Sequence, residues 1–260
     1  MRRKLKDIYM IDELESMYRL QGILATDFAC RYKSQCSAGC DNFSEAKSAF
    51  VSSGYASGAV PRLLFLSLDP GSTDKMLGPE ARLPSQVRKY EELNRDFASL
   101  NKARHWYRTH QLAWYILKRF VPGLVIAEAR KYFAHANSAK CNMGKAQNAK
   151  ANSILFQNCQ TYLPTELGVL KPDVIVTQGS EAKWAIESHS VVIATLEPKV
   201  KVISLHGREV LWLHTYHPRY VKGFYAQMAV QSGVAIGWEL LADHVLEFVS
   251  RQQRYAGLPG

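Results

Sequence analysis

Pro61-Arg-Leu-Leu-Phe-Leu-Ser-Leu68 is an almost continuous apolar run that stops at Asp69-Pro-Gly71. Such a run is typical of a strand buried on both faces, and Asp-Pro-Gly is typical of the turn that ends it. Strands buried on both faces belong to parallel sheets that carry helices on each side. The segment therefore predicts a central strand and places Asp69 at its carboxyl end.

Strand and helix patterns alternate along the rest of the chain. Further strands are predicted at 132–138, 172–179, 201–205 and 210–216, and helices near 11–20, 80–120, 148–170, 180–187 and 233–251. The alternation predicts one α/β domain over residues 1–260, a three-layer α/β/α sandwich with a central, mostly parallel, four-stranded sheet. Ligands of such sheets bind beyond the carboxyl ends of the strands. Asp69, Asn137 and the 214–220 segment are expected to meet there.

The composition excludes several classes of protein. The chain has 260 residues, of which 47% are hydrophobic, which suffices for a core and excludes a disordered or fibrous protein. No run approaches the roughly 18 apolar residues that a membrane span requires. The basic start of the chain is not followed by an apolar stretch, so we expect a cytoplasmic monomer without a membrane partner.

The charge is strongly positive and unevenly distributed. Lys and Arg number 33 against 23 Asp and Glu, a net charge of +10, which favours a polyanionic partner such as DNA. Residues 81–131 hold eleven basic and four acidic side chains, so this segment carries 11 − 4 = +7. We expect a basic helical insert at about 80–131. Its aromatic residues recur at three- and four-residue spacing, as at Trp106, His110 and Trp114, which predicts a buried stripe.

Five cysteines occur, at positions 30, 36, 40, 141 and 159. An odd number in a chain without an export signal argues against a disulfide framework and for a metal site or cluster. One close group followed by two dispersed cysteines fits a [4Fe–4S] cluster better than a zinc ribbon, with zinc as the alternative. We expect such a group to anchor the structure.

Two strand ends carry side chains suited to chemistry. Asp69 lies in a tight turn, where a carboxylate can orient a water molecule or stabilise a cation, although Asp-Pro-Gly is also common in plain turns. His214 and His217 end a later strand, and a histidine there can donate a hydrogen bond or act as general acid or base. A metallohydrolase built on these three residues lacks a further ligand at suitable spacing.

Four motifs in order resemble those of the uracil-DNA glycosylase superfamily, closest to its iron–sulfur branch. They are Leu66-Ser-Leu-Asp-Pro-Gly71, Asn137-Ser-Ala-Lys-Cys141, Cys159-x-x-Tyr-Leu163 leading into Lys171-Pro-Asp-Val-Ile-Val-Thr-Gln-Gly179, and Thr215-Tyr-His-Pro-Arg-Tyr220. The resemblance covers about residues 30–225. It implies the fold of that superfamily and a DNA partner.

The resemblance also implies a role for each motif residue. Asp69 would orient the attacking water and face the cationic sugar, and His217 would stabilise negative charge on the departing base. Asn137 would read an extruded pyrimidine. The remaining expected site residues are Gly71 and Ser72 for the base, Arg219 and Tyr220 for DNA, and Cys36, Cys40, Cys141 and Cys159 for the cluster, with Cys30 as the substitute.

The function implied is that of a monofunctional DNA glycosylase. It would flip out a pyrimidine, most simply uracil, and hydrolyse its N-glycosidic bond during base-excision repair. No motif positions a lysine for a Schiff base, so lyase activity is not expected. Gly71 replaces the tyrosine of the classical uracil enzymes, which leaves room for a C5-modified pyrimidine of phage DNA as an alternative substrate. The shifted carboxylate and the long insert favour a second alternative, a non-catalytic iron–sulfur protein that binds nucleic acid.

Overall fold

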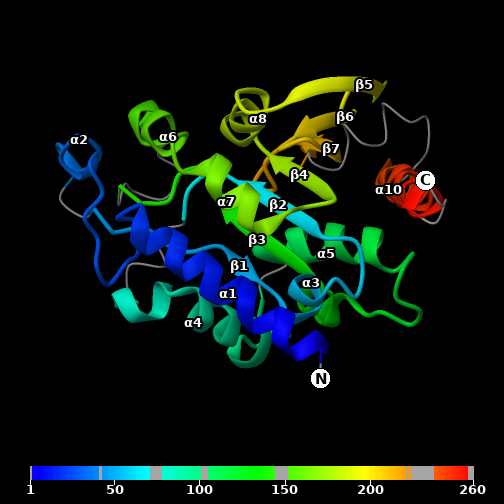
Figure 1. Ribbon diagram of the computed structural model, residues 1–260, viewed down its shortest axis with the longest axis horizontal. Coiled ribbons are helices and arrows are strands. Elements are labelled where there is room, and N and C mark those ends of the chain that lie inside the picture. The colour runs from blue at the N-terminus through cyan, green and yellow to red at the C-terminus, as the bar shows by residue number, and fades with distance from the viewer. Residues whose placement is uncertain are drawn as a thin grey trace.

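The apolar run that ends at Asp69 forms β2 (Leu63–Ser67), an interior strand of the sheet. The computed structural model describes residues 2–40, 43–70, 78–100, 105–143, 152–220, 222–223 and 237–256. β2 pairs in parallel with β3 (Phe133–Asn137) and with β4 (Val174–Gln178), and β4 pairs in parallel with β7 (Arg208–Thr215). The α/β class and the parallel core are thereby confirmed (Figure 1).

The prediction of a four-stranded sheet is wrong, because the sheet has seven strands in the order β1-β3-β2-β4-β7-β6-β5. Strands outside the parallel core pair antiparallel at the two edges: β1 (Phe50–Val51) on β3, β6 (Val200–Leu205) on β7, and β5 (Val191–Glu197) on β6. Of these, β6 matches the strand predicted at 201–205, and β1 and β5 were not predicted. His206 and Gly207, with φ of 50° and 73°, form the tight turn that makes β6 and β7 a hairpin. The sheet is therefore mixed rather than mostly parallel, with three parallel and three antiparallel strand pairs.

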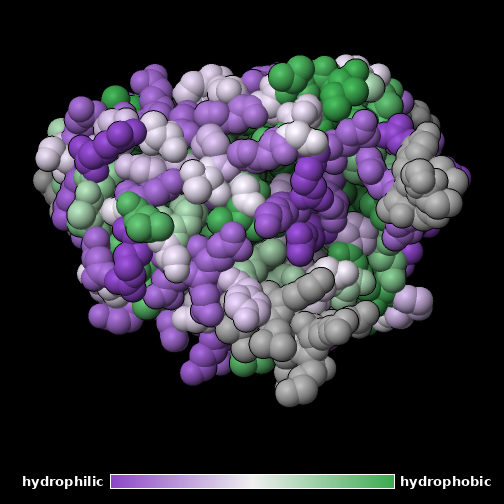
Figure 2. Space-filling view, viewed as in Figure 1, coloured by the Kyte–Doolittle hydropathy of each residue, from purple (hydrophilic) through white to green (hydrophobic). Residues whose placement is uncertain are grey.

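The strand β5 escaped prediction because its apolar side chains face outward. Val191, Ile193 and Leu196 are 70%, 51% and 44% exposed. Figure 2 shows the corresponding hydrophobic surface above β5, at the upper right of the molecule. A strand without the usual alternation of buried and exposed residues gives no periodic signal.

Helices cover both faces of the sheet, which gives the expected three layers (Figure 1). Successive residues of β2 point to opposite faces: Leu64 and Leu66 belong to one core, Leu63 and Phe65 to the other. The first core includes α1 (Arg2–Leu20), α7 (Leu163–Leu170) and α8 (Ser180–Glu187). The second includes α5 (His105–Leu117) and α10 (Gly237–Ala256).

Two predicted helices are interrupted. The segment expected at 148–170 contains α6 (Ser153–Cys159) and α7, since Pro164 begins a new helix rather than continuing the old one. The predicted helix at 80–120 is likewise divided into short helices. Those before and after α5 in the insert are the 3₁₀ turn η2 (Pro79–Arg82), α4 (Pro84–Lys89), the π turn η3 (Tyr90–Asn94) and the 3₁₀ turn η4 (Ile126–Lys131). Two more short helices, α2 (Lys33–Ser37) and α3 (Ser53–Ser57), precede the insert.

The aromatic stripe of the insert is buried as predicted. His110, Ala113 and Leu117 of α5 are buried, and Trp106 and Trp114 pack against the same core. These rings therefore support the fold rather than present faces for bases. In the described part of the chain, no helix combines the length and the apolar character needed to cross a membrane.

Candidate active site

The candidate active site lies where the four parallel strands end. Asn137 is the last residue of β3 and pairs with Ser67, the last residue of β2. Asp69 follows β2 by two residues, and His217 follows β7 by two residues. Gly179, just beyond β4, lies between Leu68 and His217, since a Cβ there would stand 3.0 Å from Leu68 Cδ2 and 3.4 Å from His217 Cβ. The expected residues thus lie at the carboxyl ends of the parallel strands.

Asp69 is half-buried in the turn after β2. Burial raises the pKa of its carboxyl group to about 6, while the positive charge of Arg219 acts in the opposite direction. Asn142 Nδ2 donates to Asp69 Oδ2 at 3.3 Å and also to the carbonyl of Pro70. At neutral pH this carboxylate is mostly ionised, yet its pKa is close enough to accept a proton.

His217 is held as a neutral hydrogen-bond donor. The backbone N–H of Arg219 donates to His217 Nδ1 at 3.2 Å, so the ring proton resides on Nε2. Burial, reinforced by the positive charge of Arg219, lowers the pKa of His217 to about 4. The side chain therefore offers an N–H group without carrying charge at neutral pH.

Ser67 connects several side chains behind this site. Its hydroxyl donates to Gln178 Oε1 at 2.7 Å and lies 2.9 Å from His135 Nε2 and 3.1 Å from His105 Nε2. Because the serine proton goes to Gln178, both histidines donate Nε2–H to the serine oxygen. The ring of His105 stacks on His217, with centroids 5.0 Å apart.

These residues were missed from the sequence. The period of two in β3 places His135 on the same face as Asn137, so one signal was present. His105 gave none, because its contact with His217 joins segments more than one hundred residues apart.

The other predicted base- and DNA-binding residues differ in their surroundings. Asn137 is buried, and its carbonyl accepts a bond from Lys140 Nζ at 2.5 Å. Arg219 and Tyr220 lie exposed on the loop after His217. Gly71 and Ser72 lie outside the described residues. His214 points to Thr177 Oγ1, at 3.0 Å, so it does not join His217 in a metal site.

A separate cavity gathers four of the five cysteines. Its lining includes Cys30, Cys36, Cys141 and Cys159. Cys40, expected as a ligand, is not part of the lining and lies 3.9 Å from the carbonyl of Cys36. The structure thus brings together the pair from the 141–159 region with Cys30 and Cys36.

The sulfur atoms of this cavity receive polar contacts. The backbone N–H of Lys140 donates to Cys159 Sγ at 3.3 Å, and Asn158 Nδ2 donates to Cys36 Sγ at 3.4 Å. Burial raises the pKa of Cys36 and Cys141 and raises that of Cys159 to about 11. A soft, all-sulfur donor set with N–H donors suits an iron–sulfur cluster or zinc. Among the described residues, no three His, Cys, Asp or Glu side chains converge closely enough to hold a single ion.

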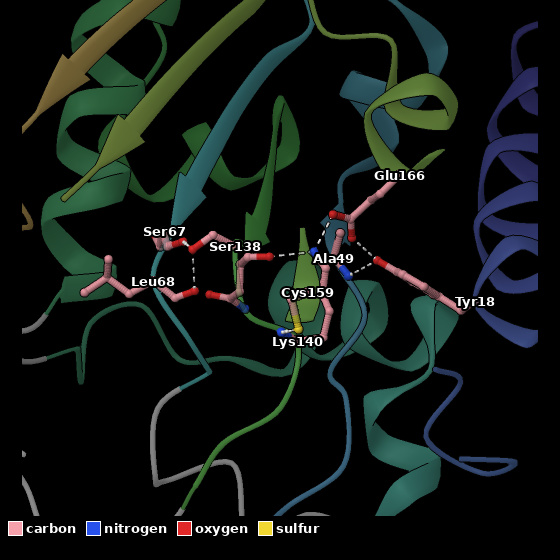
Figure 3. Close-up of polar contacts among 9 residues, drawn as sticks. Tyr18, Ala49, Ser67, Leu68, Ser138, Lys140, Cys159 and Glu166 are labelled. Atoms are coloured by element: carbon pink, nitrogen blue, oxygen red, sulfur yellow. Dashed lines mark hydrogen bonds and ion pairs between the residues drawn. The ribbon is translucent and has the colours of Figure 1, made fainter. Parts of the chain in front are cut away.

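Lys140 joins this cavity to the sheet edge (Figure 3). Its ammonium group is buried and forms an ion pair with Glu166 while donating to the carbonyl of Asn137. Tyr18 donates its hydroxyl proton to the other oxygen of Glu166 and accepts from the N–H of Ala49 at 2.9 Å. The segment from Asn137 to Asn142 is therefore fixed from the cysteine side.

Ser138 fixes the same segment from the other side. Its hydroxyl lies 2.9 Å from the carbonyl of Ser67 and 3.0 Å from that of Leu68. The turn that carries Asp69 and the segment that carries Asn137 are thus bonded directly to each other (Figure 3).

Most basic side chains of the insert form hydrogen bonds or ion pairs within the protein. Eight of its eleven basic side chains donate to or pair with other groups of the chain: Arg82, Arg88, Arg95, Arg108, Lys118, Arg119, Arg130 and Lys131. Lys102 and Arg104 lie outside the described residues. These side chains are thus largely held within the fold, while those bonded to carbonyls keep their positive charge.

Comparisons with known proteins do not extend this description. A scan against models of known protein families gives no match, and a search of the curated proteins gives no significant one. The chemistry open to the site follows from its own side chains.

Replacing Lys140 with Met is expected to lower the free energy of unfolding by about 3–5 kcal/mol, because Glu166 would remain buried without its counter-charge. Lys183→Met is the matched control, since Lys183 pairs with Glu187 at the surface and such pairs contribute about 0.3–0.5 kcal/mol. Urea unfolding measures both variants. Equal losses would contradict the importance assigned to the buried pair.

The buried histidines should make the fold sensitive to acid. Histidines of the unfolded chain take up protons below about pH 6.5, whereas burial lowers the pKa of His110 and His135 to about 3. Between these values the unfolded state binds more protons, so this contribution to stability is complete above pH 6.5 and is lost as the pH falls. His110→Phe should reduce the pH dependence of the urea midpoint between pH 7 and 5. An unchanged dependence would argue against a neutral His110.

Proposed function

We propose that this protein is a DNA glycosylase that hydrolyses the N-glycosidic bond of an extruded pyrimidine, with uracil as the first candidate. One observation carries the proposal. A carboxylate of raised pKa and a neutral imidazole N–H follow the carboxyl ends of two parallel strands, and the buried Asn137 ends a third. Removal of a base as an anion, with attack by water, needs these complementary groups.

The reaction assigns a step to each group. The bond between C1′ and the base nitrogen breaks, and its electron pair leaves with the base. The oxygen of a water molecule bonds to C1′, and the Asp69 carboxylate accepts the proton that this water loses. His217 Nε2–H donates to a carbonyl oxygen of the departing base, where negative charge develops, a contribution of about 3–4 kcal/mol for one such donor. The base then takes up a proton from solvent.

Recognition of the substrate is assigned to the neighbouring residues. The carboxamide of Asn137 offers a donor and an acceptor to the edge of a pyrimidine. Arg219 and Tyr220 lie exposed on the loop that carries His217, so they can contact the DNA around an extruded nucleotide. The net charge of +10 attracts the phosphate backbone. We expect the protein to act as a monomer in the cytoplasm.

The cysteine-lined cavity is proposed to hold a [4Fe–4S] cluster through Cys30, Cys36, Cys141 and Cys159, with zinc as the alternative. When bound, such a group supplies covalent cross-links between the N-terminal segment and the 141–159 region. Cys141 adjoins Asn142, the residue that donates to Asp69. The site is thus supported from the cavity, while the hydrolysis itself uses only the side chains at the sheet edge.

Asp69→Asn should lower the rate of base release by about 10²–10⁴-fold while DNA binding is retained, since the amide cannot accept the proton. Asp243→Asn, an exposed change on α10, is the control. The wild-type rate should rise as the pH increases through about 6, where Asp69 ionises, because His217 with its pKa of about 4 is already neutral.

Base release is measured on duplexes containing uracil or a hydroxymethylated or glucosylated pyrimidine. Release of the modified base alone would assign the second substrate class. DNA binding without release of any base would refute the glycosylase and leave a nucleic-acid-binding protein.

Cys30→Ala and Cys40→Ala distinguish the two possible ligand sets. After anaerobic purification, wild type and Cys40→Ala should contain about four iron atoms per chain and absorb near 400 nm, roughly as [4Fe–4S] proteins do. Cys30→Ala should lose most of both signals, because Cys30 lines the cavity and Cys40 does not. The reverse result would restore Cys40 as the ligand, and stoichiometric zinc in place of iron would select the alternative metal.

A further inference from the structure

The first turn of α5, which belongs to the basic insert, contacts the loop that carries His217. The rings of His105 and His217 are stacked, with an interplanar angle of 21°. One turn later, Arg108 donates from Nη1 to the carbonyl of Pro218, the residue after His217. The helix therefore holds both the ring and the backbone of this loop.

The same turn is bonded to the sheet. His105 Nε2 donates to Ser67 at the end of β2. Thr109 Oγ1 lies 3.2 Å from both Oε1 and Nε2 of Gln178, at the end of β4. The contacts of His105 and Thr109 thus fix the start of α5 against the strands, so that the helix can act as a rigid support for the loop.

At its exposed side the loop is held by the Tyr216 ring, which lies edge-on to Tyr220 and beneath Lys199 Nζ. Tyr216, Arg219 and Tyr220 are exposed, and the turn is closed by a bond from the N–H of Tyr220 to the carbonyl of His217, at 2.8 Å. The bond from Arg219 N–H to His217 Nδ1 fixes the tautomer of the ring but leaves its direction to the packing around it. His105 is the aromatic side chain that stacks on the ring.

We propose that His105 and Arg108 are positioning residues for His217, so that the insert completes the active site rather than serving only as a charged surface. His105 orients the imidazole and excludes water from one of its faces, while Arg108 fixes the backbone at Pro218. The expected effect on the rate of base release rests on the proposed glycosylase function. The positioning of the His217 ring by His105 does not depend on that function.

The charged and titratable groups that act on His217 come from several elements. Glu181 belongs to α8, Arg219 to the loop itself, His135 to β3 and His105 to α5. Arg108 also lies on α5 and contacts the same loop. The titration of His217 in His105→Ala is therefore compared with that in His105→Phe, since both variants leave all the other groups in place.

The test uses the full-length protein labelled with ¹⁵N in its histidines. In the wild type, the ring-nitrogen shifts of His217 should report a proton on Nε2 and a midpoint near pH 4. In His105→Ala the ring becomes hydrated, so its midpoint should move towards about 6.5 and the Nε2–H form should no longer dominate. His105→Phe keeps a ring in the stack and should restore the wild-type pattern.

Kinetics on a uracil-containing duplex provide the second readout. His105→Ala and Arg108→Met should lower kcat by about 10–100-fold with little change in KM, because a misplaced donor weakens only the transition state. His105→Phe should recover most of the loss. Arg119→Ala is the matched control, since Arg119 is a cation of the same insert that pairs with Glu239 of α10.

The outcomes separate this inference from the proposed function. Unchanged His217 shifts in His105→Ala would overturn the positioning role. A His105→Phe variant that resembles His105→Ala would overturn the role given to the ring contact. If the wild type releases no base, the glycosylase proposal fails, while the ring-nitrogen shifts still decide whether His105 orients His217.

Discussion

The buried ammonium group of Lys140 is the contact on which the arrangement of the site depends. It neutralises Glu166, which Tyr18 of the first helix also contacts, and it donates to the carbonyl of Asn137. The N–H of the same residue donates to Cys159. A buried charge of this kind is costly unless all its partners are in place. Lys140 and Glu166 therefore link the first helix, the cysteine cavity and the end of β3.

Dehydration at the sheet edge gives the candidate catalytic groups their character. The same low-dielectric environment raises the pKa of Asp69 to about 6 and lowers that of His217 to about 4. Both shifts favour the uncharged form. The histidine becomes a neutral donor and the carboxylate becomes a better base, so a single physical cause prepares two groups for opposite roles.

The sequence predicted those features that arise from local patterns. The parallel strands were correct because a run buried on both faces, such as 61–68, is apolar along its whole length. The number of strands was wrong because β5 exposes its apolar residues and β1 has two residues. Spacing could not choose between Cys30 and Cys40, since a short helix, α2, separates them and decides which sulfur enters the cavity. The place of Asp69, Asn137 and His217 followed from a rule about strand ends, which needs no knowledge of packing.

Contacts between segments far apart in the sequence could not be predicted from local patterns, and these contacts define the role of the insert. Its cations form bonds to backbone carbonyls and carboxylates, and its first helical turn reaches the His217 loop. Loops beyond the ends of strands lack the hydrogen bonds of a sheet, so the side chains on them need support from elsewhere. Here the support comes from both faces: the cysteine cavity belongs to one core and α5 to the other. Asp69 and Asn137 are held from the first side and His217 from the second, so the three side chains keep their relation only while both layers remain packed on the sheet.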